Sequence, residues 1–452
     1  MPSAELREPV RPGTRRQDQP AGSVRTLDGL FTRAARRHPR AVVVREGPHV
    51  LTYGKIDLLS DQLATALLRA DVQLGDPVLV HCGDHRRTLV AHLAVLKAGG
   101  VCVPVPRDLP VSQIRRIAVV SGADTVLCCG GTQEAWWHDD DRIRRFVLDD
   151  PELWKRLGAR PLDRALPRSA PAEPAYLLPA GEGGAWSSAH LVDHRAWHLA
   201  MAARSSQTGP AGPTVTVTEH PTGPATLSAM WWAFGSGSTL HAWPGEPAAG
   251  PGGGVAVYEP REYARVLDTM AREPRPPRPR MILLVGAPCP PELVARHAGI
   301  LPDTVLRAEF APGGSVLPWA VSTCPAGQDD MSRGASPVIG AAPGVRLSVR
   351  GALGENLRTG QAGEVCAQGR TLPFDVIGDG FVSGRGGALL RSGFAGRRNQ
   401  DGDIVLTGLR HAGTPHHWAS GEDDVASTPP GRGRVVLAVP SRTHGPDVCV
   451  TS

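Results

Sequence analysis

The sequence predicts an α/β fold, and three observations indicate it. Between residues 27 and 129, stretches with apolar residues at helical spacing alternate with short β-branched stretches, which is typical of parallel strands joined by helices. Beyond about residue 337 the pattern changes to short strands interrupted by glycine, which predicts a small β-barrel or sandwich. The chain of 452 residues is also longer than one hydrophobic core usually serves, so we expect at least two subdomains.

The first part of the chain supplies the clearest periodicity. Residues 1–24 are polar and rich in proline and arginine, which predicts a flexible leader. The elements expected after it, in order, are a helix over 27–38, a strand over 41–47, a helix over 58–72, a strand over 76–84, a helix over 85–100, a strand over 101–106, a helix over 107–123 and a strand over 124–129.

Three breaks rich in proline or glycine divide the rest of the chain, at 159–174, 244–254 and 272–280. The elements expected beyond them are a strand over 281–288, a helix over 290–301, barrel strands over 345–351, 363–369, 388–394 and 403–408, and a strand pair over 433–440 and 447–452.

Composition narrows the classes of function. The net charge is only +5, from 49 basic and 44 acidic residues, and the short cluster of Arg275, Arg278 and Arg280 lies among prolines. We therefore exclude nucleic acid as the main partner. No apolar run approaches the ~20 residues that a membrane span needs, and the N-terminus lacks the apolar stretch of a secretory signal. We expect a cytoplasmic protein with no membrane partner.

Eight cysteines are present and none of them forms a CxxC motif. Most lie in apolar stretches, which predicts buried thiols in a reducing compartment. They are Cys82, Cys102, Cys128, Cys129, Cys289, Cys324, Cys366 and Cys449.

Two longer motifs resemble a known family. LTYGKIDLLSDQLATAL at 51–67 and LKAGGVCVPVPRDLP at 96–110 resemble stretches of the adenylate-forming superfamily, in particular of the adenylation domains of nonribosomal peptide synthetases. The resemblance implies a large N-terminal domain of two αβ lobes plus a small β-barrel, followed by a truncated C-terminal lid. Its implied boundaries are a leader at 1–24, an α/β adenylation-like core at 25–336, a β-barrel at 337–411 and a lid remnant at 412–452.

The same resemblance implies where a nucleotide would bind, and the family's residues are missing there. The phosphate-binding loop falls at 180–188, where Glu182 brings a carboxylate toward the triphosphate and Ser188 replaces a lysine. The other residues of that loop that stand in place of the family motif are Ala180, Gly181, Gly183 and Gly184.

The other nucleotide and substrate motifs differ in the same way. The turn for phosphate and magnesium corresponds to 310–314, with Phe310 first and Gly314 last, and the ribose-binding aspartate corresponds to Phe394. The aspartate that grips a substrate ammonium group corresponds to Pro224, and we interpret the nearest acid, Glu219, as a surface residue. The barrel and hinge residues that match the family are Gly363, Glu364, Val365, Asp401, Gly402 and Gly408. Leu409 and His411 replace the arginine and the aspartate of the family's hinge motif.

The family also uses a lysine from its lid. Lysine occurs only at Lys55, Lys97 and Lys155, so residues 156–452 contain no ammonium side chain that could do this work. The resemblance therefore extends over the architecture, but the residues that carry the family's nucleotide binding and catalysis are not matched.

Other candidate sites are weak. The acids within 137–141, and His416 and His417 with Glu422 and Asp423, are more typical of solvated charge than of metal ligands. The Trp231–Trp232 pair at helical spacing predicts core. We assign no catalytic residue, no cofactor or cofactor-binding residue and no metal ligand.

Three hypotheses of function follow. The first is a catalytically degenerate adenylation-like protein, a pseudoenzyme of peptide or related secondary metabolism that binds carrier, condensation or helper proteins. The second is a divergent AMP-forming acyl- or aminoacyl-adenylating ligase with a rebuilt site. The third is a relic without function.

Overall fold

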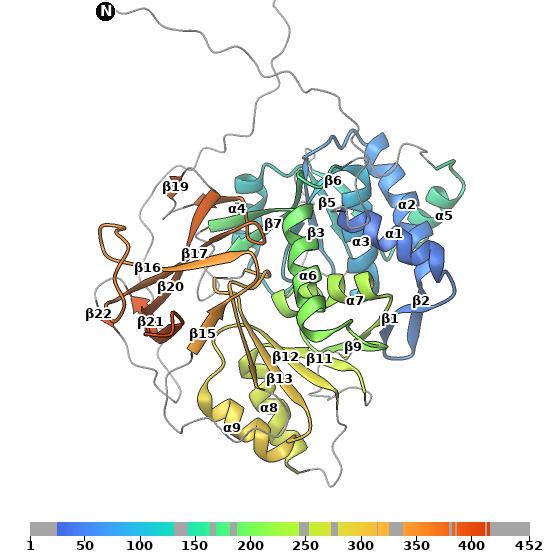
Figure 1. Ribbon diagram of the computed structural model, residues 1–452. Helices are drawn as coiled ribbons and strands as arrows, with labels where there is room; N and C mark the ends of the chain where they lie inside the picture. Colours follow the sequence, from blue (N-terminus) through green and yellow to red (C-terminus); the bar gives the residue numbers. More distant parts are fainter. Residues whose placement is uncertain are drawn as a thin grey trace, which may run out of the picture.

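The computed structural model has the predicted α/β fold, with two sheets and helices on both faces of each (Figure 1). It describes residues 25–130, 143–162, 169–180, 188–243, 253–272, 279–313, 315–324, 338–378, 382–384, 387–411 and 414–415. The strands predicted over 433–440 and 447–452, the leader at 1–24 and nearly all of 412–452 lie outside these residues.

The described helices are α1 (Leu27–Arg37), α2 (Tyr53–Arg69), α3 (His85–Ala98), α4 (Val111–Ser121), α5 (Pro151–Gly158), α6 (His194–Thr208), α7 (Pro224–Ser236), α8 (Pro260–Met270) and α9 (Pro291–Ile300). The smaller sheet consists of β3 (Pro77–His81), β4 (Val101–Pro104), β5 (Thr125–Cys128), β6 (Arg144–Val147), β7 (Pro174–Ala180), β8 (Ser188–Asp193) and β18 (Asp375–Gly378).

The larger sheet runs without interruption from the α/β part into the barrel. Its strands are β1 (Val42–Glu46), β2 (His49–Thr52), β9 (Thr214–Val217), β10 (Thr239–Ala242), β11 (Val255–Tyr258), β12 (Met281–Gly286), β13 (Val305–Phe310), β14 (Ala320–Cys324), β15 (Val338–Ala341), β16 (Val345–Arg350), β17 (Ala362–Gly369), β19 (Val382–Gly384), β20 (Gly387–Arg398), β21 (Ile404–His411) and β22 (Thr414–Pro415).

The helices pack on the apolar faces of the two sheets and so form layers around them. Helix α3 contacts β1 of the larger sheet and β3 and β4 of the smaller one, so it lies between the two sheets. Helices α8 and α9 cover the far face of the larger sheet, and α4 packs on the far face of the smaller one. The predicted parallel run is found in β3, β4 and β5. The predicted strand over 41–47 instead joins the other sheet, because β1 pairs with β10, a partner that local periodicity could not identify.

The 51–67 motif sets the start of a helix. The side chain of Thr52 accepts a hydrogen bond from the Lys55 N–H, so α2 begins at Tyr53, five residues before the predicted start. Tyr53 is fully buried, and its hydroxyl donates to the Ser238 carbonyl oxygen at 2.8 Å. The motif therefore joins α2 to the chain entering β10.

The 96–110 motif is also structural. Helix α3 ends at Gly99, whose φ of 86° is the left-handed conformation that favours glycine, and β4 follows at once. Lys97 is buried, and its Nζ donates to Asp57 Oδ1 at 2.7 Å and to Asp61 Oδ1 at 2.6 Å. One of the three lysines is thus engaged in holding α3 against α2.

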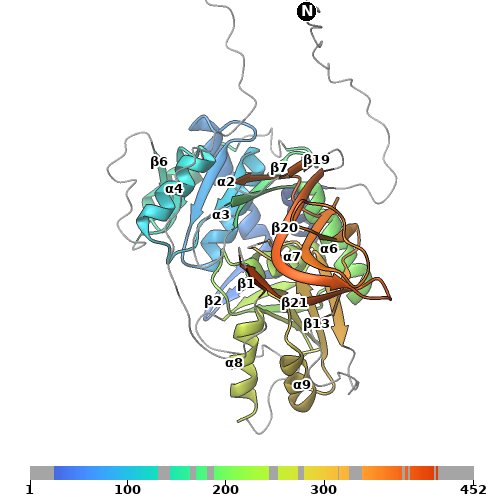
Figure 2. The same ribbon diagram turned by 90° about the vertical axis from the view of Figure 1, so that its left-hand side faces the viewer.

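The barrel strands β16, β17, β20 and β21, labelled in Figure 1, pair in that order, and β15 connects them to the α/β part of the larger sheet. Figure 2 shows β20 and β21 turned by 90° from that view. Between β20 and β21 the chain turns at Gly402, whose φ of 90° again requires a residue such as glycine. All four predicted barrel strands are found, and β20 extends from Gly387 to Arg398.

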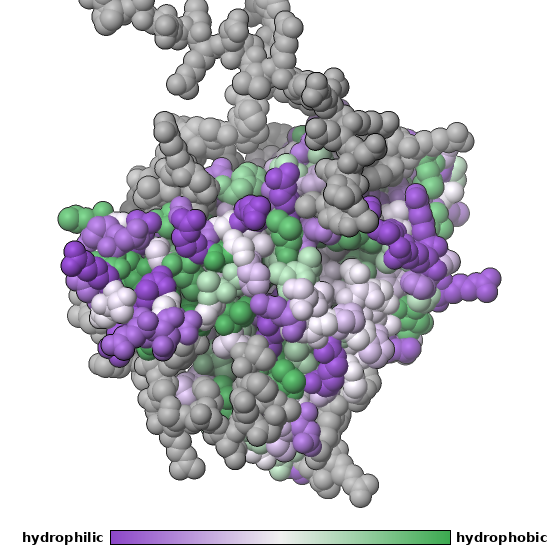
Figure 3. Space-filling view, viewed as in Figure 1, coloured by the Kyte–Doolittle hydropathy of each residue, from purple (hydrophilic) through white to green (hydrophobic). Residues whose placement is uncertain are grey.

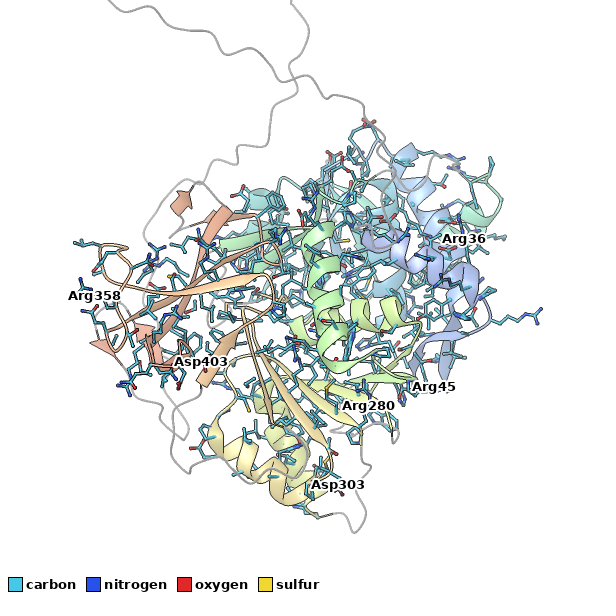
Figure 4. All side chains as sticks on the ribbon, viewed as in Figure 1. Arg36, Arg45, Arg280, Asp303, Arg358 and Asp403 are labelled. Carbon is cyan, nitrogen blue, oxygen red and sulfur yellow. The ribbon has the colours of Figure 1, made fainter. Side chains whose placement is uncertain are left out.

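The surface of the described residues mixes polar and apolar side chains. Figure 3 shows hydrophilic and hydrophobic residues interspersed on one face. The labelled charged residues of Figure 4 are spread over different parts of the fold, and they are Arg36, Arg45, Arg280, Asp303, Arg358 and Asp403. None of the helices that the structure describes combines the length and apolar character needed to cross a membrane.

Candidate functional site

Functional side chains in parallel sheets gather at the edge where the strands end, which makes the carboxyl edge of the larger sheet the candidate region. Strands β9, β11, β12 and β13 are parallel neighbours, so their carboxyl ends meet at one edge. Glu219 follows β9, Glu259 follows β11 and Phe310 ends β13. This edge therefore holds Phe310, at the position that the resemblance assigns to the phosphate turn, and Glu219, the acid nearest to the position that it assigns to the substrate ammonium group.

The two aromatic residues at nucleotide-motif positions contact each other. The rings of Phe310 on β13 and Phe394 on β20 meet edge to face, with centroids 5.3 Å apart and an interplanar angle of 84°. Phe310 is 2% exposed, and both rings belong to a core with Trp319 and Leu372. At position 394 an apolar ring packs where the family has a carboxylate that accepts ribose hydroxyls, so the described residues do not fit a nucleotide there.

The backbone around Phe394 nevertheless keeps an ordered frame. Glu364 is buried and accepts hydrogen bonds from Arg391 Nε at 2.9 Å and from the Gly393 N–H at 3.3 Å. The Phe394 N–H donates to Ser392 Oγ at 3.0 Å. The strand is thus held by its own contacts and needs no ligand to order it.

Glu219 is not the surface residue that the sequence suggested. Its side chain folds back over the start of α7, where Oε2 accepts the Thr226 N–H at 2.9 Å. A β-carbon at Gly223 would lie 2.1 Å from Glu219 Cδ, so only glycine allows this close approach. The error arose because separation along the chain says nothing about how a turn directs a side chain.

The environment of Glu219 favours its uncharged form. Burial, and then the nearby Glu259 carboxylate, raises the pKa of Glu219 to about 8. At neutral pH the side chain is therefore mostly protonated. A protonated carboxyl group does not supply the negative charge with which a substrate ammonium group would pair.

Two more carboxylates lie at the same edge. Burial raises the pKa of Glu259, and the nearby Glu262 carboxylate raises it further. Burial also raises the pKa of Glu262, although a hydrogen bond from Thr218 opposes that shift. The Thr218 hydroxyl donates to Glu262. These acids add negative potential where a polyphosphate would need positive charge. Within the part of the chain that the structure describes, no three histidine, cysteine or acidic side chains are arranged to hold a metal ion.

A buried ion-pair network behind this edge was not predicted. Glu309 on β13 accepts from Arg204 Nε at 3.0 Å and from Arg307 Nε at 2.9 Å. All three side chains are almost fully buried, and Arg204 also donates to Ser228 Oγ at 2.5 Å. Burial alone would raise the pKa of Glu309, but the two guanidinium groups outweigh it and hold that pKa below its ordinary value. The network joins α6, α7 and β13.

Most of the remaining positions singled out in the sequence either lie outside the described residues or belong to the core. Residues 181–187 of the phosphate-loop position, Gly314, the acids of 137–141 and the histidines and acids of 416–423 lie outside the described residues. Trp231 and Trp232 are each 1% exposed and are core, as predicted. Pro224 is the first residue of α7. A cavity of about 480 Å³ lies in the barrel between β15, β16 and β21, and Ile339, Leu347 and Arg398 are part of its lining.

Comparisons with known proteins agree with this architecture. Residues 31–178 match the family model described as AMP-binding enzyme. The chain is 28% identical over 288 residues to phosphinothricin tripeptide synthetase PhsC of Streptomyces viridochromogenes, which is 63% of this chain and 24% of PhsC. It is 25% identical over 404 residues to novobiocin biosynthesis protein H of Streptomyces niveus, covering 85% of this chain and 66% of that protein.

Among solved structures, the N-terminal subdomain of Klebsiella oxytoca NpsA in complex with 3-hydroxyanthranilyl-AMSN superposes with a TM-score of 0.69. The sequence identity is 14%, and the match covers 86% of this chain and 100% of that one. At that identity the match supports the fold alone. The chain spans under a quarter of the length of the peptide synthetase PhsC.

Proposed function

The chain belongs to the adenylate-forming superfamily, and we propose that it is a catalytically degenerate, adenylation-domain-like protein of nonribosomal peptide or related secondary metabolism. In this proposal it makes no acyl adenylate. It acts instead as a scaffold or binding partner of carrier, condensation or helper proteins. The likeness to a tripeptide synthetase and to a novobiocin biosynthesis protein supports the metabolic setting.

The contact between Phe310 and Phe394 is the observation that carries the proposal. These residues occupy the phosphate-turn and ribose-binding motif positions, and here their rings pack against each other in a core. A ribose at position 394 would meet the Phe394 ring, whose contact with Phe310 contributes about 0.5–1.5 kcal/mol beyond the area that the rings bury. Phe394 has no carboxylate that could accept hydrogen bonds from the ribose hydroxyls.

The electrostatics of the sheet edge support the same conclusion. Glu259 and Glu262 bring carboxylates to the carboxyl edge, and Glu219 is mostly protonated at neutral pH. A polyphosphate would meet negative potential here, and an amino-acid substrate would meet an uncharged partner.

The intact core supports a role that depends on a folded surface. Lys97, Tyr53 and Gly99 keep the contacts that the two structural motifs need. Since most core substitutions cost about 0.5–3 kcal/mol against a stability of about 5–15 kcal/mol, an unselected chain would lose core and site alike. Changes confined to the site are what selection for a folded binding partner would leave.

We expect no carboxylate-dependent exchange of pyrophosphate into ATP with any amino or aryl acid, because the described motif positions lack nucleotide contacts. We also expect the protein to form a stable complex with a carrier, condensation or helper protein whose gene lies near its own. Pull-down and size-exclusion chromatography detect such a complex.

Two outcomes would contradict the proposal. Reproducible exchange above a heat-inactivated control, lost when Phe394 is replaced by alanine, would favour a ligase with a rebuilt site. A well-folded protein that forms no complex with any carrier, condensation or helper protein encoded near its gene would favour the hypothesis of a relic without function.

A further inference from the structure

Two cysteines stand opposite each other where strands β3 and β5 end. The parallel pairing of these strands sets His81 opposite Cys128, so the next residue of each strand, Cys82 and Cys129, continues the same register. Neighbouring strands lie about 4.8 Å apart. A disulfide needs two Cα atoms about 4.4–6.8 Å apart. The backbone spacing therefore suits a disulfide at this position.

The side chains of Cys82 and Cys129 also lie on the same face of the smaller sheet. Both belong to the core between the sheets, together with Val80 of β3, whereas Cys128 packs in the core on the opposite face. The Cys82 thiol lies 3.9 Å from the Leu127 carbonyl oxygen, so it is directed toward β5. A hydrogen bond with the Cys129 thiol, and then burial, raises the pKa of the Cys82 thiol. The two sulfurs are therefore close neighbours, and Cys128 is not part of the pair.

We propose that Cys82 and Cys129 are a redox-active dithiol that closes into an intramolecular disulfide in the presence of a peroxide. Cys129 reacts first because it is 8% exposed, whereas Cys82 is fully buried. The Cys129 sulfur attacks one peroxide oxygen, the O–O bond breaks, and one water leaves to give a sulfenic acid. The Cys82 sulfur then attacks the Cys129 sulfur, the S–S bond forms, the S–O bond breaks, and a second water leaves.

The two sulfurs together lose two electrons and the peroxide gains two, while both thiol protons end in the water formed. The new bond would join the turn that leads into α3, which Asp84 caps, to the end of β5. Because it would close a long loop of chain, we expect the oxidised protein to melt at a higher temperature than the reduced protein.

The test uses the full chain. Folded protein is treated with hydrogen peroxide, the remaining thiols are alkylated, and tryptic peptides are analysed by mass spectrometry. We expect a cross-linked pair of peptides that has lost two hydrogen atoms, in the wild type and in Cys128→Ser but not in Cys129→Ser. The melting temperature should rise on oxidation in the first two proteins and return to its starting value with dithiothreitol.

Cys128→Ser is the matched control, because Cys128 is adjacent in sequence and faces the other side of the sheet. A cross-link that needs Cys128, one that persists in Cys129→Ser, or oxidation to sulfinic acid without any cross-link would overturn the proposal. In Cys128→Ser the tryptic peptide keeps Cys129 as its single cysteine, so a cross-link in that variant decides the question even where Cys129→Ser fails to fold. No nucleotide is involved, and the result is therefore separate from the proposed function.

Discussion

Replacing Glu309 by alanine should lower the free energy of unfolding by about 3–5 kcal/mol, a large share of the stability of a typical protein. The side chain is 1% exposed and accepts from Arg204 and Arg307, which are themselves almost fully buried. Removal of the carboxylate leaves two guanidinium groups in the core without their counter-charge. Urea unfolding followed by circular dichroism measures the change.

The exposed ion pair between Asp268 and Arg296 is the matched control. Its N–O distance of 2.5 Å equals that between Arg204 Nη2 and Glu309 Oε2, but its side chains are 60% and 41% exposed. Asp268→Ala should therefore change the unfolding free energy by at most about 1 kcal/mol. Equal effects of Asp268→Ala and Glu309→Ala would mean that the Glu309 network does not bear on stability as described.

Replacing Glu219 by glutamine should remove a loss of stability that the wild type shows as the pH rises. The pKa of Glu219 is raised from an ordinary 4.5 to about 8 in the folded state, so folding favours the protonated form. Its contribution is fully present below about pH 4.5 and is lost as the pH rises toward 8. By pH 7 the wild type should have lost about 3 kcal/mol of unfolding free energy through this group.

The glutamine variant cannot ionise and still offers an oxygen to the Thr226 N–H. It should be more stable than the wild type at pH 7, and the two proteins should converge near pH 4. Glu292→Gln, which changes an exposed carboxyl group in the first turn of α9, serves as the control and should leave the slope unchanged. Chemical unfolding at several pH values gives both slopes, and parallel curves for wild type and Glu219→Gln would refute the burial of this carboxyl group.

These residues also show what the sequence could and could not predict. The end of α3 at Gly99 is local, because one left-handed residue stops the helix, and it was predicted correctly. The Arg204–Glu309 pair joins residues 105 positions apart. In VLRAEF, alternation places Arg307 and Glu309 together on one face, which without Arg204 suggests a solvent-exposed face.

The candidate site was predicted only in part, because its contacts also join residues that are far apart in the sequence. The resemblance located Phe310 and Phe394 and showed that family residues are absent there. Only the folded chain shows that the two rings contact each other. Glu219 was misplaced because the close approach to Gly223 depends on the turn between β9 and α7.

Titration calorimetry with ATP and magnesium tests the central claim most directly. The folded protein, confirmed by a cooperative thermal transition, is titrated beside an active adenylation domain as positive control. The packed Phe310–Phe394 contact and the carboxylates at the sheet edge predict no heat of binding at millimolar nucleotide. A dissociation constant in the micromolar range would contradict the account.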